Sequence, residues 1–471
     1  MSAPVSRLDG VVPGFARALR TFRSAAATVP AYREFLDAHG VDPATVHTPD
    51  DFAAVPAVTK QNYVAAYPRN ELFPAGAITG AGIWSTSTGS SGTPTYWPRG
   101  PVAAEQSIIQ YDRLFRHSFA SHEIPTLLVI GFALGNWIGG TYTLAAALEL
   151  PRLGHKLSVV APGFDLDAIL ANIAELGPHY AQVVLAGYPP FLKDVLDAAG
   201  PQVRSQRIRL LMAGEKISET WRDRVLAPID APAAQSSLIY GTADAGIMGF
   251  ETPTTIALRR AAGDDPALHE ALFGAVDVAP TFVEYDPRLR FTEVDADGHL
   301  LFTVAGAMPL VRYRIKDEGS VLSATEVANL AGTQGIPFTT AAERAGFIAL
   351  RGRSDVAASF YAVKLYPESI KPVLERPDLA AVLSGKFSLS VPDPDADRPD
   401  LVLDVELARN AGGDAALAAV VRERVVAQLI RTSTEYRALH ADKGAAAEPV
   451  VRLHTFGSTT FRYDVKVRWA S

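Results

Sequence analysis

Residues 182–213 read QVVLAGYPPFLKDVLDAAGPQVRSQRIRLLMA, which is an apolar strand, a helix and a second apolar strand in succession. The apolar runs Gln182–Leu185 and Arg209–Met212 predict buried strands, and the helical pattern of Pro190–Ala198 lies between them. Strands joined through a helix are typical of a parallel sheet, in which ligands bind at the carboxyl ends of the strands. The sequence therefore predicts an α/β fold with a binding site at that edge.

The same alternation extends along the chain in both directions. Further strands and helices are predicted at Thr126–Ile130, Leu157–Val160, Leu166–Glu175 and Glu219–Leu226. Near the start, apolar side chains recur at helical spacing at Phe15, Leu19, Phe22 and Ala26. A second helix is expected at residues 31–39. Together these patterns predict a large mixed or parallel sheet with helices.

From Ala279 onward the pattern changes to short strands separated by turns. These strands are expected at Val283–Tyr285, Leu289–Glu293, Leu300–Val304 and Leu310–Lys316 and form a small β module. After Gly352 a smaller α+β segment follows, with a helix at Pro367–Glu375, strands at Lys386–Val391 and Leu401–Leu407, and a helix at Asp414–Thr434. We expect an N-terminal domain over residues 1–351 and a small mobile C-terminal domain over 352–471.

Composition narrows the classes of function. The chain has 471 residues, 48% of them hydrophobic and 20% charged, which fits a globular protein of more than one domain. A net charge of −7 disfavours nucleic acid as a partner, and the absence of cysteine excludes disulfides, thiolate metal sites and a cysteine nucleophile. Glycines interrupt the apolar run 127–150, so no membrane segment is expected, and the N-terminus has no apolar leader. We expect a soluble cytoplasmic protein.

The stretch Ser85–Thr95, STSTGSSGTPT, is rich in hydroxyls and glycine. Glycines let backbone N–H groups approach an anion closely, and hydroxyls add donors, so this composition suits a loop around the phosphates of a nucleotide. It is not a Walker A loop, because the spacer and the Gly-Lys-Ser/Thr end are missing. A plain surface turn is the alternative.

Two more motifs end predicted strands. Tyr240-Gly-Thr-Ala-Asp244 follows an apolar run, so its tyrosine could stack on a base or aryl ring and Asp244 could hold a cation. The strand Leu310–Lys316 alternates apolar and cationic residues and is expected to end in a turn at Asp317, whose carboxylate could bind a ribose diol. Ordinary strand–turn and turn-capping roles are the alternatives.

Two positions nearer the C-terminus indicate a function only when they are considered together with the other motifs. Gly352-Arg-Ser-Asp355 is either a plain linker or a hinge between domains. Lys466 stands in an alternating stretch near the end of the chain, where a lysine is usually a solvated charge.

In this order the motifs resemble the adenylate-forming (ANL) superfamily, and within it the phenylacetate–coenzyme A ligase branch. The resemblance starts at Val29-Pro-Ala-Tyr-Arg-Glu-Phe, His47-Thr-Pro-Asp-Asp-Phe and Val55-Pro-Ala-Val-Thr-Lys60, and it continues to Lys466. It implies a ligase that activates a carboxylic acid with Mg-ATP as an acyl-adenylate, releases pyrophosphate, and passes the acyl group to an acceptor, most often coenzyme A. ATP and Mg²⁺ are the implied cofactors, with coenzyme A as co-substrate.

The resemblance also assigns roles by position. ATP or AMP would contact Ser87, Thr88, Gly89, Ser90, Ser91, Gly92, Gly214, Glu215, Tyr240, Gly241, Thr242, Asp317 and Arg353. Of these, the hydroxyl residues would hold the triphosphate, Gly214, Glu215 and Tyr240 would border adenine, and Asp317 would bind the ribose. Asp244 would hold the metal, Asp355 would be the hinge, and Lys466 would bridge the α-phosphate and the acyl oxygen in the first step.

The chain departs from the family pattern at several positions. Thr93 replaces a lysine of the phosphate loop, and Asp244 replaces a longer glutamate, so Glu251 could share the metal. Tyr361 and Ala362 stand where glycines usually let the pantetheine arm pass, and Val465 replaces the glycine before Lys466. The substitution at Ala362 lowers the expectation for coenzyme A and raises that for other acceptors.

An acid pocket is expected from Phe132, Trp137, Gly139 and Tyr188, with aromatic walls that suit an aryl or arylacetic acid. Three alternatives stay open: transfer to an amine to give an amide, adenylation of nitrite, and a non-catalytic nucleotide-binding relative. The acid, the acceptor and the oligomeric state, with a homodimer considered, are left open as well.

Overall fold

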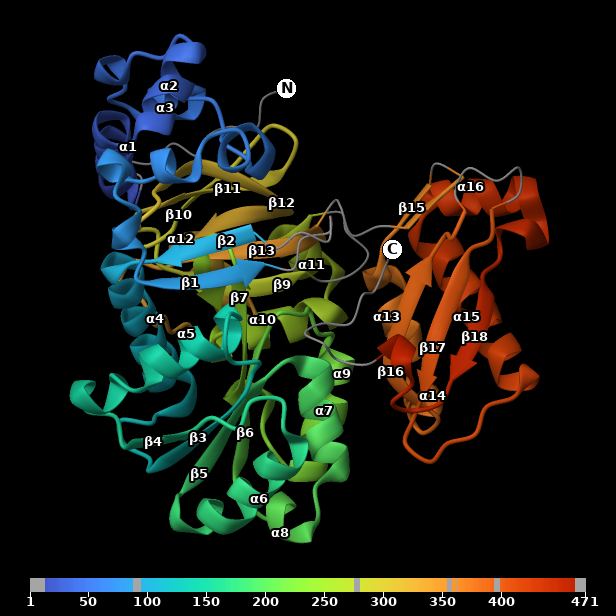
Figure 1. The fold of residues 1–471 in the computed structure, drawn as a ribbon. Helices are drawn as coiled ribbons and strands as arrows, with labels where there is room; N and C mark the ends of the chain where they lie inside the picture. Colours follow the sequence, from blue (N-terminus) through green and yellow to red (C-terminus); the bar gives the residue numbers. More distant parts are fainter. Residues whose placement is uncertain are drawn as a thin grey trace. The chain divides into compact units, whose positions relative to one another are not determined.

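The computed structural model describes residues 13–87, 95–274, 280–353, 358–361, 363–393 and 399–461. By their contacts the described residues fall into two compact units. The larger unit comprises residues 13–216, 225–274 and 280–352, and the smaller one comprises residues 217–224 and the described residues from 353 onward. Figure 1 traces both units.

The chain opens with three helices, α1 (Phe15–Thr28), α2 (Pro30–Ala38) and α3 (Pro49–Ala54). The helical spacing predicted for α1 is confirmed, because Phe22 and Ala26 are buried in one core with strands of the β-rich half. Pro30 stands in the first turn of α2, where its missing N–H costs nothing, so this helix begins one residue earlier than expected.

The parallel strands predicted from the sequence are all present. They are β3 (Thr126–Gly131), β4 (Leu157–Val160), β5 (Gln182–Gly187), β6 (Ile208–Ala213) and β7 (Ser236–Thr242), and they lie side by side in the order β4-β3-β5-β6-β7. Each pairs with its neighbour in parallel. The carboxyl ends of these strands therefore meet at one edge of the sheet.

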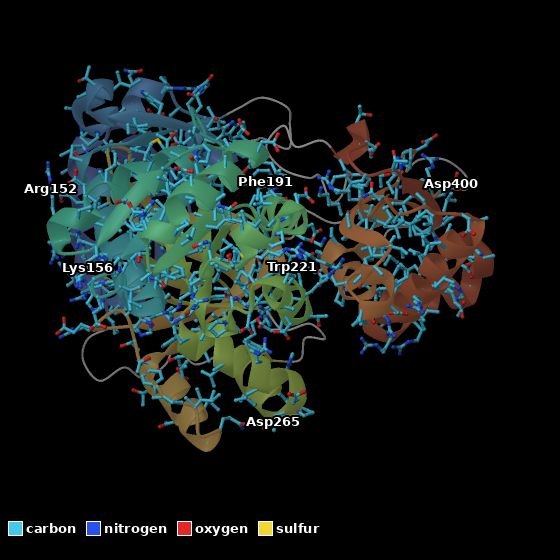
Figure 2. All side chains as sticks on the ribbon, turned by 90° about the horizontal axis from the view of Figure 1, so that it is seen from below. Arg152, Lys156, Phe191, Trp221, Asp265 and Asp400 are labelled. Carbon is cyan, nitrogen blue, oxygen red and sulfur yellow. The ribbon has the colours of Figure 1, made fainter. Side chains whose placement is uncertain are left out.

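Helices alternate with the strands along the chain. They are α4 (Pro101–Phe119), α5 (Ile138–Ala147), α6 (Leu166–Leu176), α7 (Pro189–Ala198), α8 (Pro201–Arg204), α9 (Glu219–Leu226), α10 (Pro253–Asp264), α11 (Pro266–Phe273) and α12 (Ala324–Thr333). Leu128 and Ile130 of β3 pack with residues of α4 and α5, while α6 and α7 contact β3 and β5. Figure 2 shows the side chains, among them Phe191 of α7, whose ring meets that of Phe164 edge-on at 5.0 Å.

The β-rich part continues the same sheet rather than forming a separate module. Its strands are β8 (Gly246–Phe250), β9 (Thr281–Tyr285), β10 (Phe291–Val294), β11 (His299–Val304), β12 (Leu310–Ser323) and β13 (Gly346–Arg353), in the order β10-β11-β12-β13-β9-β8-β7. Between β8 and β9 the pairing is confined to Phe250 and Glu284. The two halves of the sheet are thus joined at a narrow seam.

The strand β12 is longer than the sequence predicted. The prediction ended it at Lys316, with Asp317 in a turn, and this is wrong, because the strand runs on to Ser323 and Asp317 lies inside it. Lys316 has a φ of +63°, so the backbone is irregular at this point without leaving the sheet.

A two-stranded ribbon, β1 (Ile83–Ser87) and β2 (Thr95–Arg99), flanks the hydroxyl-rich loop. Its first strand is bonded to the segment before α5, since the Thr86 backbone N–H donates to the Asn136 carbonyl at 2.9 Å. The N-terminal segment lies against β12, where the Arg314 N–H donates to the Val58 carbonyl at 2.9 Å. The ribbon is thereby bonded to the segment before α5, and the N-terminal segment is bonded to the sheet.

The smaller unit is α+β, as expected. It contains the hairpin β14 (Ala358–Phe360) and β15 (Val363–Leu365), the sheet β16 (Leu383–Ser390), β17 (Val402–Leu407) and β18 (Val450–His454), and the helices α13 (Pro367–Leu374), α14 (Pro377–Ala380), α15 (Ala415–Thr432) and α16 (Thr434–Lys443). The single helix predicted over 414–434 is interrupted at Ser433, whose extended backbone and hydroxyl cap α16. None of the helices described is long and apolar enough to cross a membrane.

Candidate functional site

Part of the predicted site lies outside the described residues. These positions are Thr88, Gly89, Ser90, Ser91, Gly92, Asp355 and Lys466, together with Thr93, Ala362 and Val465. Of the phosphate loop, Ser87 is described, at the end of β1, where its hydroxyl accepts a hydrogen bond from Trp97 Nε1 at 3.4 Å. Arg353 ends β13.

The carboxyl ends of β5 and β6 bring two predicted residues together. Tyr188 follows β5 and Glu215 follows β6, and the Tyr188 hydroxyl donates to Glu215 Oε1 at 2.7 Å. Directly before Glu215, Gly214 turns the chain with a φ of +93°, a conformation that side-chain-bearing residues rarely adopt. The expected adenine border and the expected acid pocket therefore share a hydrogen bond.

Tyr240 and Asp317, which lie in different motifs, form a second contact. The Tyr240 hydroxyl donates to Asp317 Oδ2 at 2.5 Å, and both side chains are buried, at 6% and 5% exposure. Such burial is favourable for a carboxylate only when its oxygens are hydrogen-bonded. Tyr240 thus orients the carboxylate that the resemblance assigns to the ribose.

Asp244 is held in a similar way. Its Oδ2 accepts a hydrogen bond from the Tyr313 hydroxyl at 2.5 Å, and its backbone carbonyl accepts one from Arg99 Nη1 at 3.1 Å. The Arg99 guanidinium also donates to the Ala243 carbonyl. Burial lowers the pKa of Arg99, and the carboxylate of Asp244 acts in the opposite direction. The turn after β7 is therefore fixed by the ribbon that carries the phosphate loop.

Sequence reasoning missed Arg99. The residue stands in β2, a few positions beyond the hydroxyl-rich stretch, and 8% of it is exposed. A guanidinium that bonds backbone carbonyls far away in the chain leaves no spacing pattern, so no sequence signal identifies it.

The residues near Asp244 could bind Mg²⁺ only together with the phosphates of a bound nucleotide. Mg²⁺ usually keeps several waters and takes one or two carboxylates together with substrate phosphates, which matches a single aspartate. The suggestion that Glu251 shares the metal is wrong, because Glu251 is fully buried after the far end of β8, accepts from the Leu238 N–H at 3.1 Å and lies 3.7 Å from Arg259.

Gly241 and Thr242 end β7 beside this turn. The Thr242 hydroxyl accepts the Ala245 N–H at 3.0 Å and so closes the turn. A Cβ at Gly241 would meet its nearest neighbour, the Gly246 carbonyl oxygen, at 3.4 Å, which is ordinary contact. The protein itself therefore does not require glycine there, and the expected close approach to a ligand stays a prediction.

The predicted acid-pocket residues gather at the ends of β3 and β5. Gly131 and Gly187 are paired across these strands, so the following Phe132 and Tyr188 start from neighbouring positions. Both side chains are buried, and Phe132 lies over Gly139, where an added Cβ would be 3.5 Å from its ring. Trp137 precedes α5 and forms a bridge to Thr86 of β1.

A Ser–His–Asp arrangement occurs elsewhere in the larger unit. Ser121 Oγ lies 2.6 Å from His155 Nδ1, and His155 Nε2 lies 2.9 Å from Asp112 Oδ1. Ser121 has no exposed surface, and burial lowers the pKa of His155. A nucleophilic serine must reach its substrate, so this chain of hydrogen bonds fastens α4 to the segment before β4 and is not a hydrolase site.

Comparison with known proteins places the fold. No family model and no curated protein matches the sequence. Among solved structures, 2-hydroxyisobutyryl-CoA ligase in the postadenylation state, in complex with R3-HIB-AMP, has a TM-score of 0.66 and 16% identity, covering 97% of this chain and 88% of that one. The same ligase in an open conformation with 2-HIB-AMP and CoA gives 0.54 at 16% identity, covering 97% and 90%.

A third structure, an anthranilate CoA ligase in complex with anthranoyl-AMP, has a TM-score of 0.50 and 12% identity. It covers 82% of this chain, which spans 65% of that one. At these identities the likeness shows the fold: a large α/β unit and a small C-terminal unit, as in these ligases.

Proposed function

We propose that the chain is an AMP-forming acid ligase, in which residues 1–351 form the adenylation domain and residues 352–471 a mobile C-terminal domain. The observation that carries the proposal is the hydrogen bond between Tyr240 and Asp317 at 2.5 Å, inside a fold shared along 97% of the chain with a CoA ligase in the postadenylation state, in complex with R3-HIB-AMP. Two motifs chosen from the sequence for one nucleotide thus meet in space.

The proposed first step joins an acid to AMP. A carboxylate oxygen of the acid bonds to the α-phosphorus of ATP while the bond to the oxygen bridging to the β-phosphate breaks, and pyrophosphate leaves. Transfer of this kind depends on positioning and charge stabilisation, which Ser87 and the loop after it would give to the phosphates. Mg²⁺ neutralises phosphate charge when bound, and Asp244 is the carboxylate that would hold it.

The other residues have positioning roles in this proposal. Gly214 and Glu215 border the adenine, Asp317 accepts hydrogen bonds from the ribose hydroxyls, and Tyr240 keeps its carboxylate in place. Lys466 contacts the α-phosphate and acyl oxygen in the first step, and Asp355 is the hinge for the second. The acid is aryl or arylacetic, held among Phe132, Trp137, Gly139 and Tyr188, and coenzyme A is the first candidate for acceptor.

One observation favours an amine as acceptor instead. Tyr361 has a φ of +45°, a left-handed conformation usual for glycine, and its ring packs on Phe360 at 4.8 Å. The backbone shape that a glycine would give is kept, while the side chain occupies space that a glycine would leave open. An amide ligase needs no channel for a pantetheine arm, so a bulky residue here is compatible with it.

The test measures pyrophosphate release from Mg-ATP with aryl, arylacetic, fatty and amino acids and with nitrite, without coenzyme A or amine. We expect release with one acid, a steep loss in Lys466→Ala with ATP binding nearly unchanged, and weaker ATP binding in Asp317→Asn. Lys156→Ala, which removes an exposed lysine bonded to the Glu123 carbonyl, is the control and should behave like the native chain.

Coenzyme A or an amine is then added to Mg-ATP and the acid that gives release. The product, a thioester or an amide, shows which of the two accepts the acyl group. No release with any acid, while ATP still binds, would overturn the ligase proposal in favour of a non-catalytic nucleotide-binding protein.

A further inference from the structure

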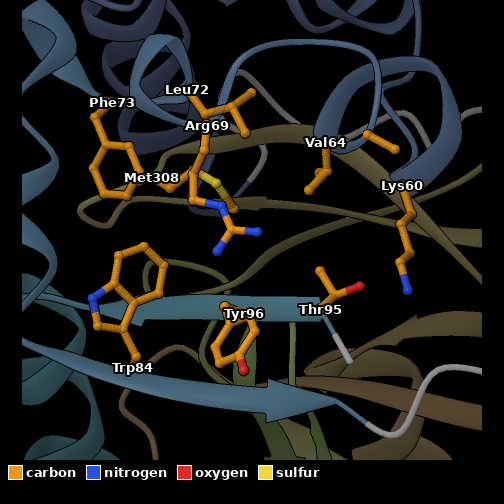
Figure 3. Close-up of a pocket in the computed structure, with 10 residues that line it drawn as sticks. Lys60, Val64, Arg69, Leu72, Phe73, Trp84, Thr95, Tyr96 and Met308 are labelled. Carbon is orange, nitrogen blue, oxygen red and sulfur yellow. The ribbon is translucent and has the colours of Figure 1, made fainter. Parts of the chain in front are cut away.

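A cavity of about 160 Å³ opens between the N-terminal helical segment and the β1–β2 ribbon (Figure 3). Its lining was not among the predicted site residues and consists of Lys60, Val64, Ala65, Arg69, Leu72, Phe73, Trp84, Thr95, Tyr96 and Met308. Leu72, Phe73 and Met308 are buried, and the Phe73 and Trp84 rings lie 6.0 Å apart. The inner wall is therefore apolar and aromatic.

Trp84 and Tyr96, two of the ribbon residues that line the cavity, lie on one face of the ribbon. Side chains alternate between the faces of a strand, and the pairing Thr86–Tyr96 puts Tyr96 on the face opposite to Trp97. Trp97 packs edge-on against Tyr313 at 6.1 Å, and Tyr313 bonds Asp244. Tyr96 and Trp84 thus lie on the other face of the ribbon from Trp97 and Ser87, while Thr95, which also lines the cavity, is paired with Ser87 at the end of the ribbon.

Two cations reach into the cavity. Figure 3 shows the Arg69 guanidinium and the Lys60 ammonium both directed toward the ribbon. The guanidinium lies 5.9 Å from the centre of the Trp84 ring and 5.5 Å from that of Tyr96. Within the described part of the chain, neither cation has a hydrogen bond or an acidic partner.

The aromatic rings hold the guanidinium by its face and leave its N–H edge able to bind an anion. Because no acidic side chain among the described residues pairs with Lys60 or Arg69, the cavity carries positive charge at its rim above an apolar floor. This arrangement favours a ligand with an anionic group attached to a hydrophobic body.

The volume of the cavity limits the hydrophobic part of such a ligand to about one ring. A protein cavity of roughly 150 Å³ holds a benzene molecule, and this one is of similar size. We propose that the cavity is a second binding site, separate from the acid ligase site, for a small anion that carries a single aromatic ring. The proposal does not depend on the ligase function.

The test is calorimetric titration of the native chain, at low salt and without nucleotide, with benzoate and with phenyl phosphate, which distinguish a carboxylate from a phosphate group. Benzyl alcohol and inorganic phosphate are the probes that lack the charge or the ring, and we expect both to bind more weakly. Binding of the anionic probes should weaken about tenfold in the double variant Lys60→Gln/Arg69→Gln, since a hydrogen bond to a charged group is worth about that factor.

Arg20→Gln is the matched control, because Arg20 is an exposed arginine of α1 that does not line the cavity. Lys60 and Arg69 lie at the surface, so their variants should unfold at the native temperature. Trp137→Leu tests whether the anionic probes bind instead in the predicted acid pocket, which Trp137 is expected to line. Loss of binding in Trp137→Leu but not in the double variant, or no binding of either anion at millimolar concentration, would overturn the proposal.

Discussion

The two neighbouring glycines of α5 predict opposite responses to the same substitution. A Cβ at Gly140 would lie 2.2 Å from the Ala133 carbonyl oxygen and 2.8 Å from its carbon, far inside contact distance. That oxygen also accepts the Gly140 N–H at 3.1 Å, so the helix cannot move away without loss of this bond. A Cβ at Gly139 would meet the Phe132 ring at 3.5 Å, which is ordinary contact.

The magnitudes follow from these distances. Alanine in place of a helical glycine stabilises by about 0.5–1 kcal/mol, a gain that Gly139→Ala should keep in part. Overpacking costs about 1–3 kcal/mol, and a lost hydrogen bond costs about 1 kcal/mol more, so Gly140→Ala should be destabilised by about 1–3 kcal/mol overall.

Urea unfolding followed by tryptophan fluorescence gives the assay, because Trp137 directly precedes α5. Gly139→Ala should unfold at the native or a higher urea concentration and Gly140→Ala at a clearly lower one. Equal midpoints, or a destabilised Gly139→Ala with a native-like Gly140→Ala, would refute the packing described around this helix.

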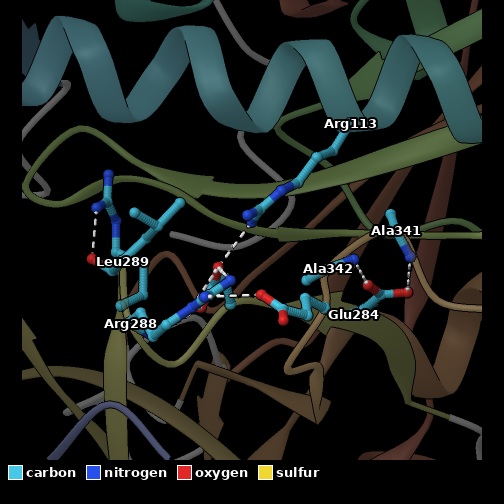
Figure 4. A network of polar contacts seen from close by, with 9 residues as sticks. Arg113, Glu284, Arg288, Leu289, Ala341 and Ala342 are labelled. Carbon is cyan, nitrogen blue, oxygen red and sulfur yellow. Dashed lines mark hydrogen bonds and ion pairs between the residues drawn. The ribbon is translucent and has the colours of Figure 1, made fainter.

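Three further predictions concern buried polar groups. Tyr240→Phe removes a donor from the buried carboxylate of Asp317 and should lower the free energy of unfolding by about 1–3 kcal/mol in urea melts, with a weaker ATP complex; no change in either would contradict the contact. Burial raises the pKa of Glu284 from 4.5 to about 7 despite two backbone N–H bonds (Figure 4), so its stabilising contribution is complete below pH 4.5 and is lost as the pH rises through about 7. The native chain should therefore lose up to about 3 kcal/mol across that window relative to Glu284→Gln, and parallel pH profiles in urea melts would be the contrary result. Arg99→Lys should cost about 1–2 kcal/mol in thermal unfolding, since one ammonium does not match the two carbonyls that the guanidinium bonds, and an unchanged melting temperature would count against it.

Local patterns were sufficient for most elements. The strand Leu157–Val160 and the helix Glu219–Leu226 have the predicted bounds, because an apolar run and a helical period are properties of consecutive residues. The end of β12 was not predictable in this way. An added Cβ at Gly319 would lie 2.6 Å from the Ala349 carbonyl, so this part of the strand is set by close packing against a segment thirty residues later.

The residues of the candidate site fall into the same two groups, those that local sequence predicts and those that depend on contacts between distant segments. Tyr188 and Tyr240 were identified because they follow or end recognisable strands, and Asp317 because it follows the alternating stretch 310–316, although the strand runs on past it. The structure places Tyr240 next to Asp317. The buried Arg99 and the cavity between Arg69 and Trp84 depend on contacts between distant segments, for which a single sequence carries no periodic signal.

The aromatic cluster of the first helices has a consequence for biosynthesis. Phe15 and Phe52 pack against Phe291 at 6.1 and 5.9 Å, so these helices complete their core with a strand that the ribosome makes much later. At about 5–20 residues per second, the ribosome needs roughly ten seconds or more to supply that strand. During this interval the apolar faces of the helices are uncovered on the nascent chain. The protein should therefore depend on a chaperone that shields these faces until the sheet is finished.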